Sequence, residues 1–110
     1  MSLPDCLRGE VWLTRLDPTE GNELRKTRPC VIISPDAMNA GLGTVIVMPL
    51  TSGSHAAGFR APTVFRGIPG FLLGDQLRAV SKGRLIRRVG VIDGKTMGDA
   101  LAILREMFMD

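Results

Sequence analysis

The sequence predicts a small, mostly β fold of the α+β class, in which short strands form a twisted barrel or half-barrel covered by one C-terminal helix. Several short segments are apolar or alternate apolar with polar residues, and turns containing glycine or proline separate them. After residue 93 the apolar residues instead recur at helical spacing. With 110 residues, the chain is expected to fold as one domain over residues 1–110.

The first predicted strand covers residues 8–16, where apolar and polar side chains alternate. We expect Val11, Leu13 and Leu16 on one face of this strand and Trp12 on the other. The loop that follows opens on Asp-Pro and is longer than a simple hairpin needs. Loops of this length in compact domains are usually functional or disordered.

The second predicted strand, residues 29–33, is apolar throughout and is therefore expected to be buried on both faces. The Ser-Pro pair that follows it ends the strand. Residues 36–43 contain two glycines and an asparagine, so we expect no more than one helical turn there. A third strand is predicted over residues 44–50.

The second half of the chain is expected to add three more strands. A loop of small residues over 51–58 leads into a strand over 59–65, whose proline favours an edge position. A turn over 67–70 precedes a strand over 72–80 that contains a glycine irregularity. The last strand is predicted over 84–92, after a short break.

A C-terminal amphipathic helix completes the predicted fold. Asp93 is a suitable N-cap. Beyond it, Met97, Leu101, Leu104 and Phe108 recur at helical spacing, so they are expected to form the apolar face.

The composition indicates a basic protein that is expected to be soluble and cytoplasmic. The formal charge is +3, and eleven of the fourteen cations are arginine, whose forked guanidinium suits phosphate. No apolar run approaches the roughly 20 residues of a membrane span, and no secretory signal is recognisable. Aromatic residues are few and tyrosine is absent, so any grip on RNA is expected to be mainly electrostatic. Cys6 and Cys30 lack histidines at metal spacing, and we expect free thiols, with Cys30 buried.

The candidate site is the junction GNELRKTRPCVIIS, residues 21–34, where a charged loop runs into the buried strand. Glu23 lies close in sequence to Arg25, Lys26 and Arg28. If these side chains share a pocket, the pKa of Glu23 is lowered, so the carboxylate is ionised near neutrality and can accept a proton. The alternative is a solvated carboxylate that makes only weak surface pairs.

Arg28 precedes a proline, which restricts it to extended backbone and fixes where its fork can point. Such fixed geometry suits bidentate phosphate binding, although Arg28 could instead pair with Asp75 or a carbonyl. Thr51 and Ser52 follow a strand and could donate hydroxyls to a phosphate, or simply form a turn.

Other chemistries find less support. His55 is the only histidine, and its small neighbours offer nothing that would orient the ring, which favours a surface histidine over a general acid. The acidic residues are scattered and no P-loop is present, so neither a metal nor another cofactor is expected. A basic run could form a phosphate track or a merely solvated face; it comprises Arg78, Lys82, Arg84, Arg87 and Arg88.

As an ordered set, the segments RGEVWL, LDPTEGNE, TRPCVIIS, MPLTS and GDQLR, with the terminal helix, resemble the MazF/PemK family of toxin endoribonucleases over nearly the whole chain. The resemblance implies an SH3-like, CcdB-like small β-barrel, a homodimer, and the toxin role of a type II toxin-antitoxin system. It also implies metal-independent, sequence-specific cleavage of single-stranded RNA (mRNA interferase activity) and a cognate antitoxin with an acidic disordered tail.

Carried over by position, the resemblance implies that Glu23, Arg28 and Thr51 are catalytic. The 2′-OH of the RNA would attack its own phosphate, giving a 2′,3′-cyclic phosphate and a 5′-OH end. Glu23 is expected to act as the base, while Arg28 and Thr51 hold the non-bridging oxygens. The residues expected to bind RNA are Arg25, Lys26, Ser52, His55, Asp75, Gln76 and Arg78.

Two departures from the family pattern bear on substrate choice: Leu24 stands where a glutamine is often found, and the loop over 52–58 has its own sequence. Two other functions stay open. A CcdB-like gyrase poison would bind protein without cutting RNA, and a non-catalytic barrel would only bind nucleic acid.

Overall fold

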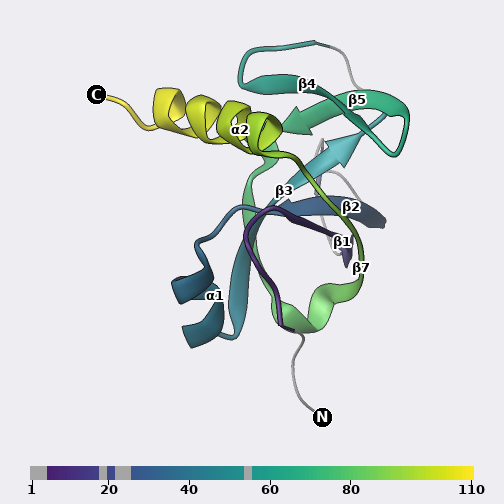
Figure 1. The fold of residues 1–110 in the computed structure, drawn as a ribbon, viewed down its shortest axis with the longest axis vertical. Helices are drawn as coiled ribbons and strands as arrows, with labels where there is room; N and C mark the ends of the chain where they lie inside the picture. The colour runs from purple at the N-terminus through teal and green to yellow at the C-terminus, as the bar shows by residue number, and fades with distance from the viewer. Residues whose placement is uncertain (1–4, 18–19, 22–25, 54–55) are drawn as a thin grey trace.

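The computed structural model describes residues 5–17, 20–21, 26–53 and 56–110. Figure 1 shows a strongly curved sheet with helix α2 lying across one end and helix α1 at the other. None of the helices in these residues is long and apolar enough to cross a membrane. In chain order the elements are β1 (Glu10–Arg15), β2 (Thr27–Ile32), α1 (Asp36–Gly41), β3 (Thr44–Thr51), β4 (Arg60–Phe65), β5 (Ile68–Leu73), a 3-10 helix (Gly74–Gln76), β6 (Arg78–Ser81), a second 3-10 helix (Lys82–Arg84), β7 (Leu85–Val91) and α2 (Gly94–Met107).

Strand β3 is the centre of the antiparallel sheet, whose order is β4-β5-β3-β2-β1-β7. One edge of β3 pairs with β2, from Cys30 opposite Pro49 to Ile32 opposite Val47. Its other edge is shared by two partners. The first half pairs with β6, and the last two residues pair with β5.

The single strand predicted over 72–80 is therefore wrong, because the 3-10 helix Gly74–Gln76 splits it into β5 and β6. Both strands nevertheless follow the same edge of β3. The break occurs where Gly74 donates its N–H to the carbonyl of Phe59 at 3.0 Å. A Cβ at Gly74 would lie 2.5 Å from that oxygen, so the close approach requires glycine. The turn predicted over 67–70 is also too long, since β5 already begins at Ile68.

Backbone hydrogen bonds do not close the sheet into a full barrel among the described residues, because β4 and β7 stand at opposite ends of the strand order. The α+β class and the edge position of β4 are confirmed. The two free edges meet through side chains instead. The ring of Phe65 in β4 lies so close to Gly90 in β7 that a Cβ there would be 2.8 Å from its Cε1 and Cζ atoms. The sheet therefore stays open as a half-barrel, with this packing contact between its two edge strands.

The core has two clusters on opposite faces of β1 and β2, so both strands are buried on both faces. Trp12, Leu16 and Cys30 belong to one cluster, whereas Val11 and Val31 belong to the other. The predicted double burial of residues 29–33 is confirmed from Cys30 onward, while Pro29 is half-buried. The prediction that Leu16 shares a face with Val11 is wrong, because Leu16 packs in the cluster of Trp12 and Val11 in the other cluster.

Helix α2 covers the second cluster with Met97, Leu101 and Leu104. Asp93 is its N-cap, as predicted, and accepts a hydrogen bond from the N–H of Thr96 at 2.7 Å. Phe108 does not belong to the apolar face, because it lies beyond the last helical residue and is 73% exposed. Helix α1, with six residues, is longer than the single turn expected.

Both cysteines are buried and neither is in a disulfide. The burial of Cys30 was predicted. Cys30 lies in the first core cluster, where burial raises the pKa of its thiol to about 12. The thiol is therefore protonated at neutral pH and has the inert character of a small apolar side chain.

Glu10 is a buried carboxylate that joins three parts of the chain. Its Oε1 accepts hydrogen bonds from the N–H of Leu7 at 2.8 Å and from Trp12 Nε1 at 3.1 Å. Its Oε2 accepts one from Arg88 in β7 at 3.0 Å. Burial alone would raise the pKa of Glu10, but these hydrogen bonds outweigh it and hold the pKa below its usual range. The ionised form thus stabilises the fold.

We predict that Glu10→Gln lowers the free energy of unfolding at pH 7 by roughly 1–3 kcal/mol, the usual size of a charge-assisted hydrogen bond. Because the folded pKa lies below the unfolded value of about 4.3, this stabilisation is present above that pH and is lost as the pH falls through the folded pKa. Urea denaturation should therefore show that the free energies of unfolding of wild type and variant differ less near pH 3 than at pH 7. Glu106→Gln, at an exposed position on α2, is the control. A difference that stays constant with pH would show that the charge of Glu10 is unimportant.

Candidate active site

A cavity of about 160 Å³ lies where β2 and the end of β3 meet the hairpin formed by β4 and β5. Three residues singled out from the sequence, Arg28, Thr51 and Ser52, line it together. The rest of the lining is mainly apolar and comprises Pro29, Leu50, Thr63, Phe65, Ile68, Pro69 and Gly70. The cavity therefore combines one cation and hydroxyl groups with an apolar wall.

Arg28 is held by the sheet rather than by a loop. Strand β2 begins at Thr27, two residues earlier than predicted, and Arg28 is paired in register with Thr14 of β1. The following proline requires extended backbone at Arg28, which is why the strand includes it. The half-buried side chain thus enters the cavity from a rigid element.

Asp75 is not the partner of Arg28. Its two carboxylate oxygens accept hydrogen bonds from Nε and Nη2 of Arg60, both at 2.9 Å. The hydrogen bond from Arg60 holds the pKa of Asp75 below its usual range. Neither Asp75 nor Gln76, both in the 3-10 helix after β5, lines the cavity. Their suggested contacts with RNA stay predictions.

Thr51 can lie at this position because its neighbour on β5, Gly70, has no side chain. A Cβ at Gly70 would lie 2.0 Å from the carbonyl oxygen of Thr51 and 2.9 Å from its carbonyl carbon. No side chain fits there, and the obstructing atoms are backbone, which cannot swing aside. The hydroxyl oxygen of Thr51 accepts a long hydrogen bond from the N–H of Gly53 at 3.4 Å. This arrangement leaves the hydroxyl hydrogen available to an acceptor in the cavity.

The long loop between β1 and β2 is pinned at its base. Leu16 donates its N–H to the carbonyl of Lys26 at 2.8 Å, and Lys26 donates its own N–H to Asp17 Oδ1 at 3.0 Å. Lys26 has a φ of 64° and is exposed just before β2 begins. Glu23 and Arg25 lie outside the described residues, as does His55, so the structure places none of them.

The predicted basic run over 78–88 is mostly occupied by structural contacts. Arg78 donates to the carbonyl of Leu16 at 3.2 Å, and Arg84 donates to the carbonyls of Arg15 and Asp17. These two arginines thus hold the base of the β1–β2 loop.

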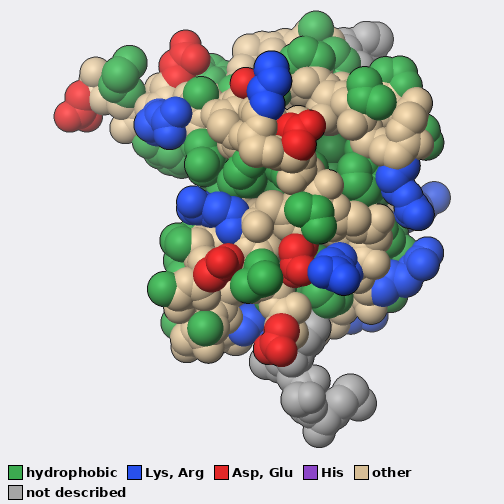
Figure 2. Space-filling view, viewed as in Figure 1, with side chains coloured by type: hydrophobic (Ala, Val, Ile, Leu, Met, Phe, Trp, Pro, Cys, Tyr) green, Lys and Arg blue, Asp and Glu red, His purple; other side chains and the backbone are tan. Residues whose placement is uncertain are grey.

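Lys82 and Arg88 have structural partners as well. Lys82 is buried and donates to the carbonyl of Asn39, while Arg88 pairs with Glu10. Arg87 is exposed. Figure 2 shows several basic side chains along one flank of the molecule.

The apolar wall of the cavity is not predicted by the sequence patterns. Phe65, Ile68 and Pro69 reach it because β4 and β5 fold back over the end of β3. In the sequence, the only indication of this wall is that apolar residues flank the pair Arg66-Gly67. A simple turn explains that pattern equally well. Among the described residues, no group of three or more His, Cys, Asp or Glu side chains could hold a metal ion.

Comparison with known proteins gives consistent matches. The model of the family described as PemK-like, MazF-like toxin of type II toxin-antitoxin system matches residues 7–108. Endoribonuclease PemK of Escherichia coli is 37% identical over 106 residues, which cover 91% of this chain and 80% of that protein.

Two solved structures share the fold. MazF from Deinococcus radiodurans matches with a TM-score of 0.82 at 22% identity, over 97% of each chain. An endoribonuclease from mycobacterial species, solved in complex with its cognate antitoxin, matches with a TM-score of 0.77 at 20% identity, over 92% of each chain.

We predict that Gly70→Ala lowers the free energy of unfolding by about 1–3 kcal/mol or more, because the new methyl group must displace the backbone of Thr51. Gly98→Ala is the matched control. Gly98 lies in α2, where an added Cβ would have no other atom within 4 Å, so the change should stabilise by up to about 1 kcal/mol. Urea denaturation measures both, and amide NMR shifts of Thr51 and Ser52 report the displacement. Equal stability of the two variants would contradict the close approach.

Proposed function

Because this chain belongs to the PemK-like, MazF-like toxins of type II toxin-antitoxin systems, we propose that it is a metal-independent, sequence-specific endoribonuclease that cleaves single-stranded RNA. The observation that carries this proposal is the cavity in which Arg28 and Thr51, from neighbouring strands, meet. A guanidinium and a hydroxyl at one small opening can bind the oxygens of a single phosphate.

The proposed reaction uses a nucleophile that the RNA itself carries. The ribose 2′-oxygen bonds to the adjacent phosphorus while the bond from phosphorus to the 5′-oxygen breaks. The products are a 2′,3′-cyclic phosphate and a 5′-OH end. One proton leaves the 2′-OH and one reaches the departing 5′-oxygen. Because the nucleophile is already tethered, the protein needs only to orient it, move protons and stabilise charge.

Arg28 is proposed as the main charge stabiliser. A guanidinium stays protonated at all physiological pH values, so it is a poor proton donor but a strong partner for a phosphate that gains negative charge. Thr51 would donate its hydroxyl hydrogen to one of the two non-bridging oxygens that the guanidinium fork also contacts. Together these donors can supply the charge stabilisation without a metal ion. The proposal of Glu23 as the base rests on the family resemblance, since that residue lies outside the described part of the chain.

The apolar wall formed by Phe65, Ile68 and Pro69 suits the base next to the cleaved phosphate. Among the proposed RNA-binding residues, Ser52 lines the cavity and Lys26 is exposed at the entrance of β2. The other members of that set are Arg25, His55, Asp75, Gln76 and Arg78.

We further propose that the chain acts as a homodimer and is inhibited by a cognate antitoxin with an acidic disordered tail. The mycobacterial relative was solved with its cognate antitoxin, which supports a partner of this class. Arg28 lines the cavity and Lys26 is exposed just before β2, so both offer positive charge to an acidic tail that would compete with RNA. Arg78 and Arg84 contribute less than the sequence suggested, because backbone carbonyls already occupy them.

The alternative CcdB-like function, poisoning of gyrase by protein binding, gains no support from the comparisons, in which the similar proteins are named endoribonucleases. That function would also give the Arg28 cavity no role.

The direct test is incubation of the purified protein with single-stranded RNA in excess EDTA. We expect cleavage at a short recurring motif, with 5′-OH ends that polynucleotide kinase labels without prior phosphatase treatment. Replacing the 2′-OH at the cleaved position with hydrogen should abolish the product. Arg28→Ala protein purified in the same way controls for contaminating nucleases. Intact RNA, together with inhibition of gyrase supercoiling, would favour the alternative function.

The Arg28→Lys variant tests directly whether cleavage needs the forked guanidinium of Arg28. We predict a fall in kcat of about 10²-fold, comparable to removing one oxyanion donor, because a point charge cannot bind two oxygens in the same plane. The fold should survive, since the charge and the aliphatic stem are kept. Arg105→Lys, on an exposed residue in the last turn of α2, is the matched control. Cleavage by Arg28→Lys at the wild-type rate would exclude a bidentate role.

A further inference from the structure

The turn between β4 and β5 carries an arginine where the backbone disfavours one. Phe65 and Ile68 are paired in register, so Arg66 and Gly67 form a two-residue hairpin loop. Both central residues have positive φ, 53° and 80°, which is the pattern of a type I′ turn. Asn, Asp and Gly are preferred at the first central position, because a longer side chain is sterically disfavoured there. Backbone strain of this kind often marks a functional position.

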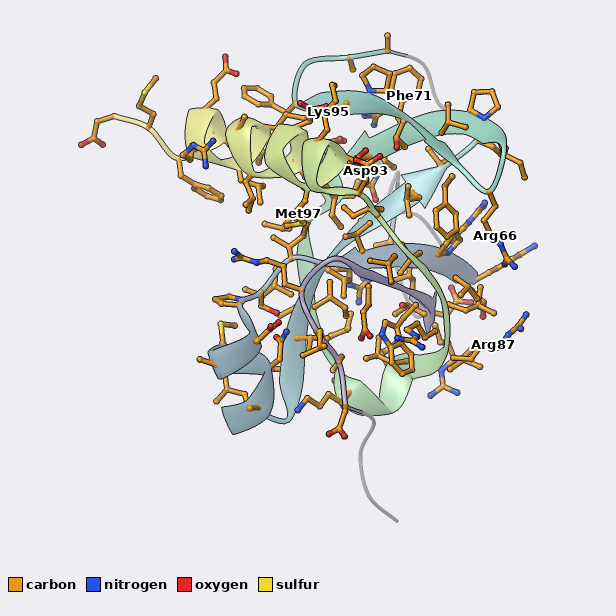
Figure 3. The ribbon with its side chains drawn as sticks, viewed as in Figure 1. Arg66, Phe71, Arg87, Asp93, Lys95 and Met97 are labelled. Carbon is orange, nitrogen blue, oxygen red and sulfur yellow. The ribbon has the colours of Figure 1, made fainter. Side chains whose placement is uncertain are left out.

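The Arg66 side chain is exposed and makes no hydrogen bond or ion pair with any other residue in the described part of the chain. This distinguishes it from Arg60, which pairs with Asp75, and from the carbonyl-bound Arg78 and Arg84. Figure 3 shows Arg66 at the tip of the β4–β5 hairpin, with its side chain directed away from the body of the protein. No structural partner therefore accounts for its presence.

The hairpin tip adjoins the cavity, and Arg66 itself lines a separate hollow beside Gly90 and Asp93. The two residues that flank the turn, Phe65 and Ile68, both line the cavity that contains Arg28. The Phe65 ring is fixed against Gly90 of β7, so the hairpin cannot easily move away. In Figure 3, Arg87 of β7 lies on the same side of the molecule and adds positive charge to this flank.

We propose that Arg66 is a phosphate-binding residue that holds the RNA backbone next to the nucleotide bound in the cavity. This inference rests on the proposed endoribonuclease function. A single-stranded RNA is too large for a cavity of about 160 Å³, so the rest of its chain must lie on the surface beside the cavity. An exposed guanidinium on the turn beside the cavity matches the charge and geometry of a backbone phosphate.

A trade-off between stability and binding follows. Arg66→Asn places the preferred residue in the turn and should raise Tm by roughly 2–5 °C. It should also weaken RNA binding. The slope measured is that of the logarithm of the binding constant against the logarithm of the salt concentration. One lost phosphate contact reduces its magnitude by about 0.7 for a single strand, which corresponds to about fivefold weaker binding at 0.1 M salt. Arg66→Lys keeps the charge and should keep the slope.

The experiment measures the binding of a fluorescent, fully 2′-O-methylated single-stranded RNA across a KCl series, because this probe cannot be cleaved through its 2′-oxygen. Wild type, Arg66→Asn and Arg66→Lys are compared with Arg105→Gln. This control removes the same charge from the far end of α2 and should leave the slope unchanged. The expected result is a smaller slope and a higher Tm for Arg66→Asn alone.

Three outcomes would overturn the inference. A wild-type slope and affinity for Arg66→Asn would show that Arg66 does not contact RNA. Equal slope losses in Arg66→Asn and Arg105→Gln would indicate a non-specific charge effect. Normal RNA binding with weakened binding of an acidic antitoxin-tail peptide would assign Arg66 to a protein interface instead. Cleavage of unmodified RNA by wild type is run in parallel, so a failure of the proposed endoribonuclease function is recognised separately.

Discussion

The structure depends on strand β3, which must accept hydrogen-bonded partners along both edges. β2 occupies one edge, and β6 and β5 share the other. The last contact is the tightest, because Gly70 leaves no space between β5 and the carbonyl of Thr51. This approach folds the β4–β5 hairpin over the end of β3 and creates the cavity beside Arg28. Site and sheet therefore arise from the same packing constraint.

Two groups of arginines in this chain have different roles. Arg78, Arg84 and Arg88 hold backbone carbonyls or the buried Glu10 carboxylate, so their charge supports the fold. Arg28 lines the cavity from a paired strand, and Arg66 lies on the tight turn beside it. Because both residues stand on ordered backbone, binding a phosphate requires little further ordering of the backbone. The proposed RNA path follows this second group.

Local patterns predicted the features that local physics determines. The burial of residues 30–33 and the Asp93 cap were confirmed, because strand burial and capping depend on adjacent residues. Within residues 72–80 the glycine irregularity was predicted, and it occurs at Gly74. The full split into two strands was not predictable, because it depends on the carbonyl of Phe59 approaching Gly74. Likewise, the carbonyl partners of Arg78 and Arg84 lie far away in sequence. Arg28, Thr51 and Ser52 came from motifs, whereas the hairpin wall formed by Phe65 and Ile68 emerged only from strand pairing.

The central claim is that Arg28 and Thr51 bind the phosphate at which RNA is cut. A crystal structure of the protein with a 2′-O-methylated RNA that spans its cleavage motif tests this most directly. We expect the phosphate at the cleavage position to accept hydrogen bonds from the Arg28 guanidinium and the Thr51 hydroxyl, with the neighbouring base against Phe65. RNA bound on another face, or a phosphate held away from both side chains, would contradict the account.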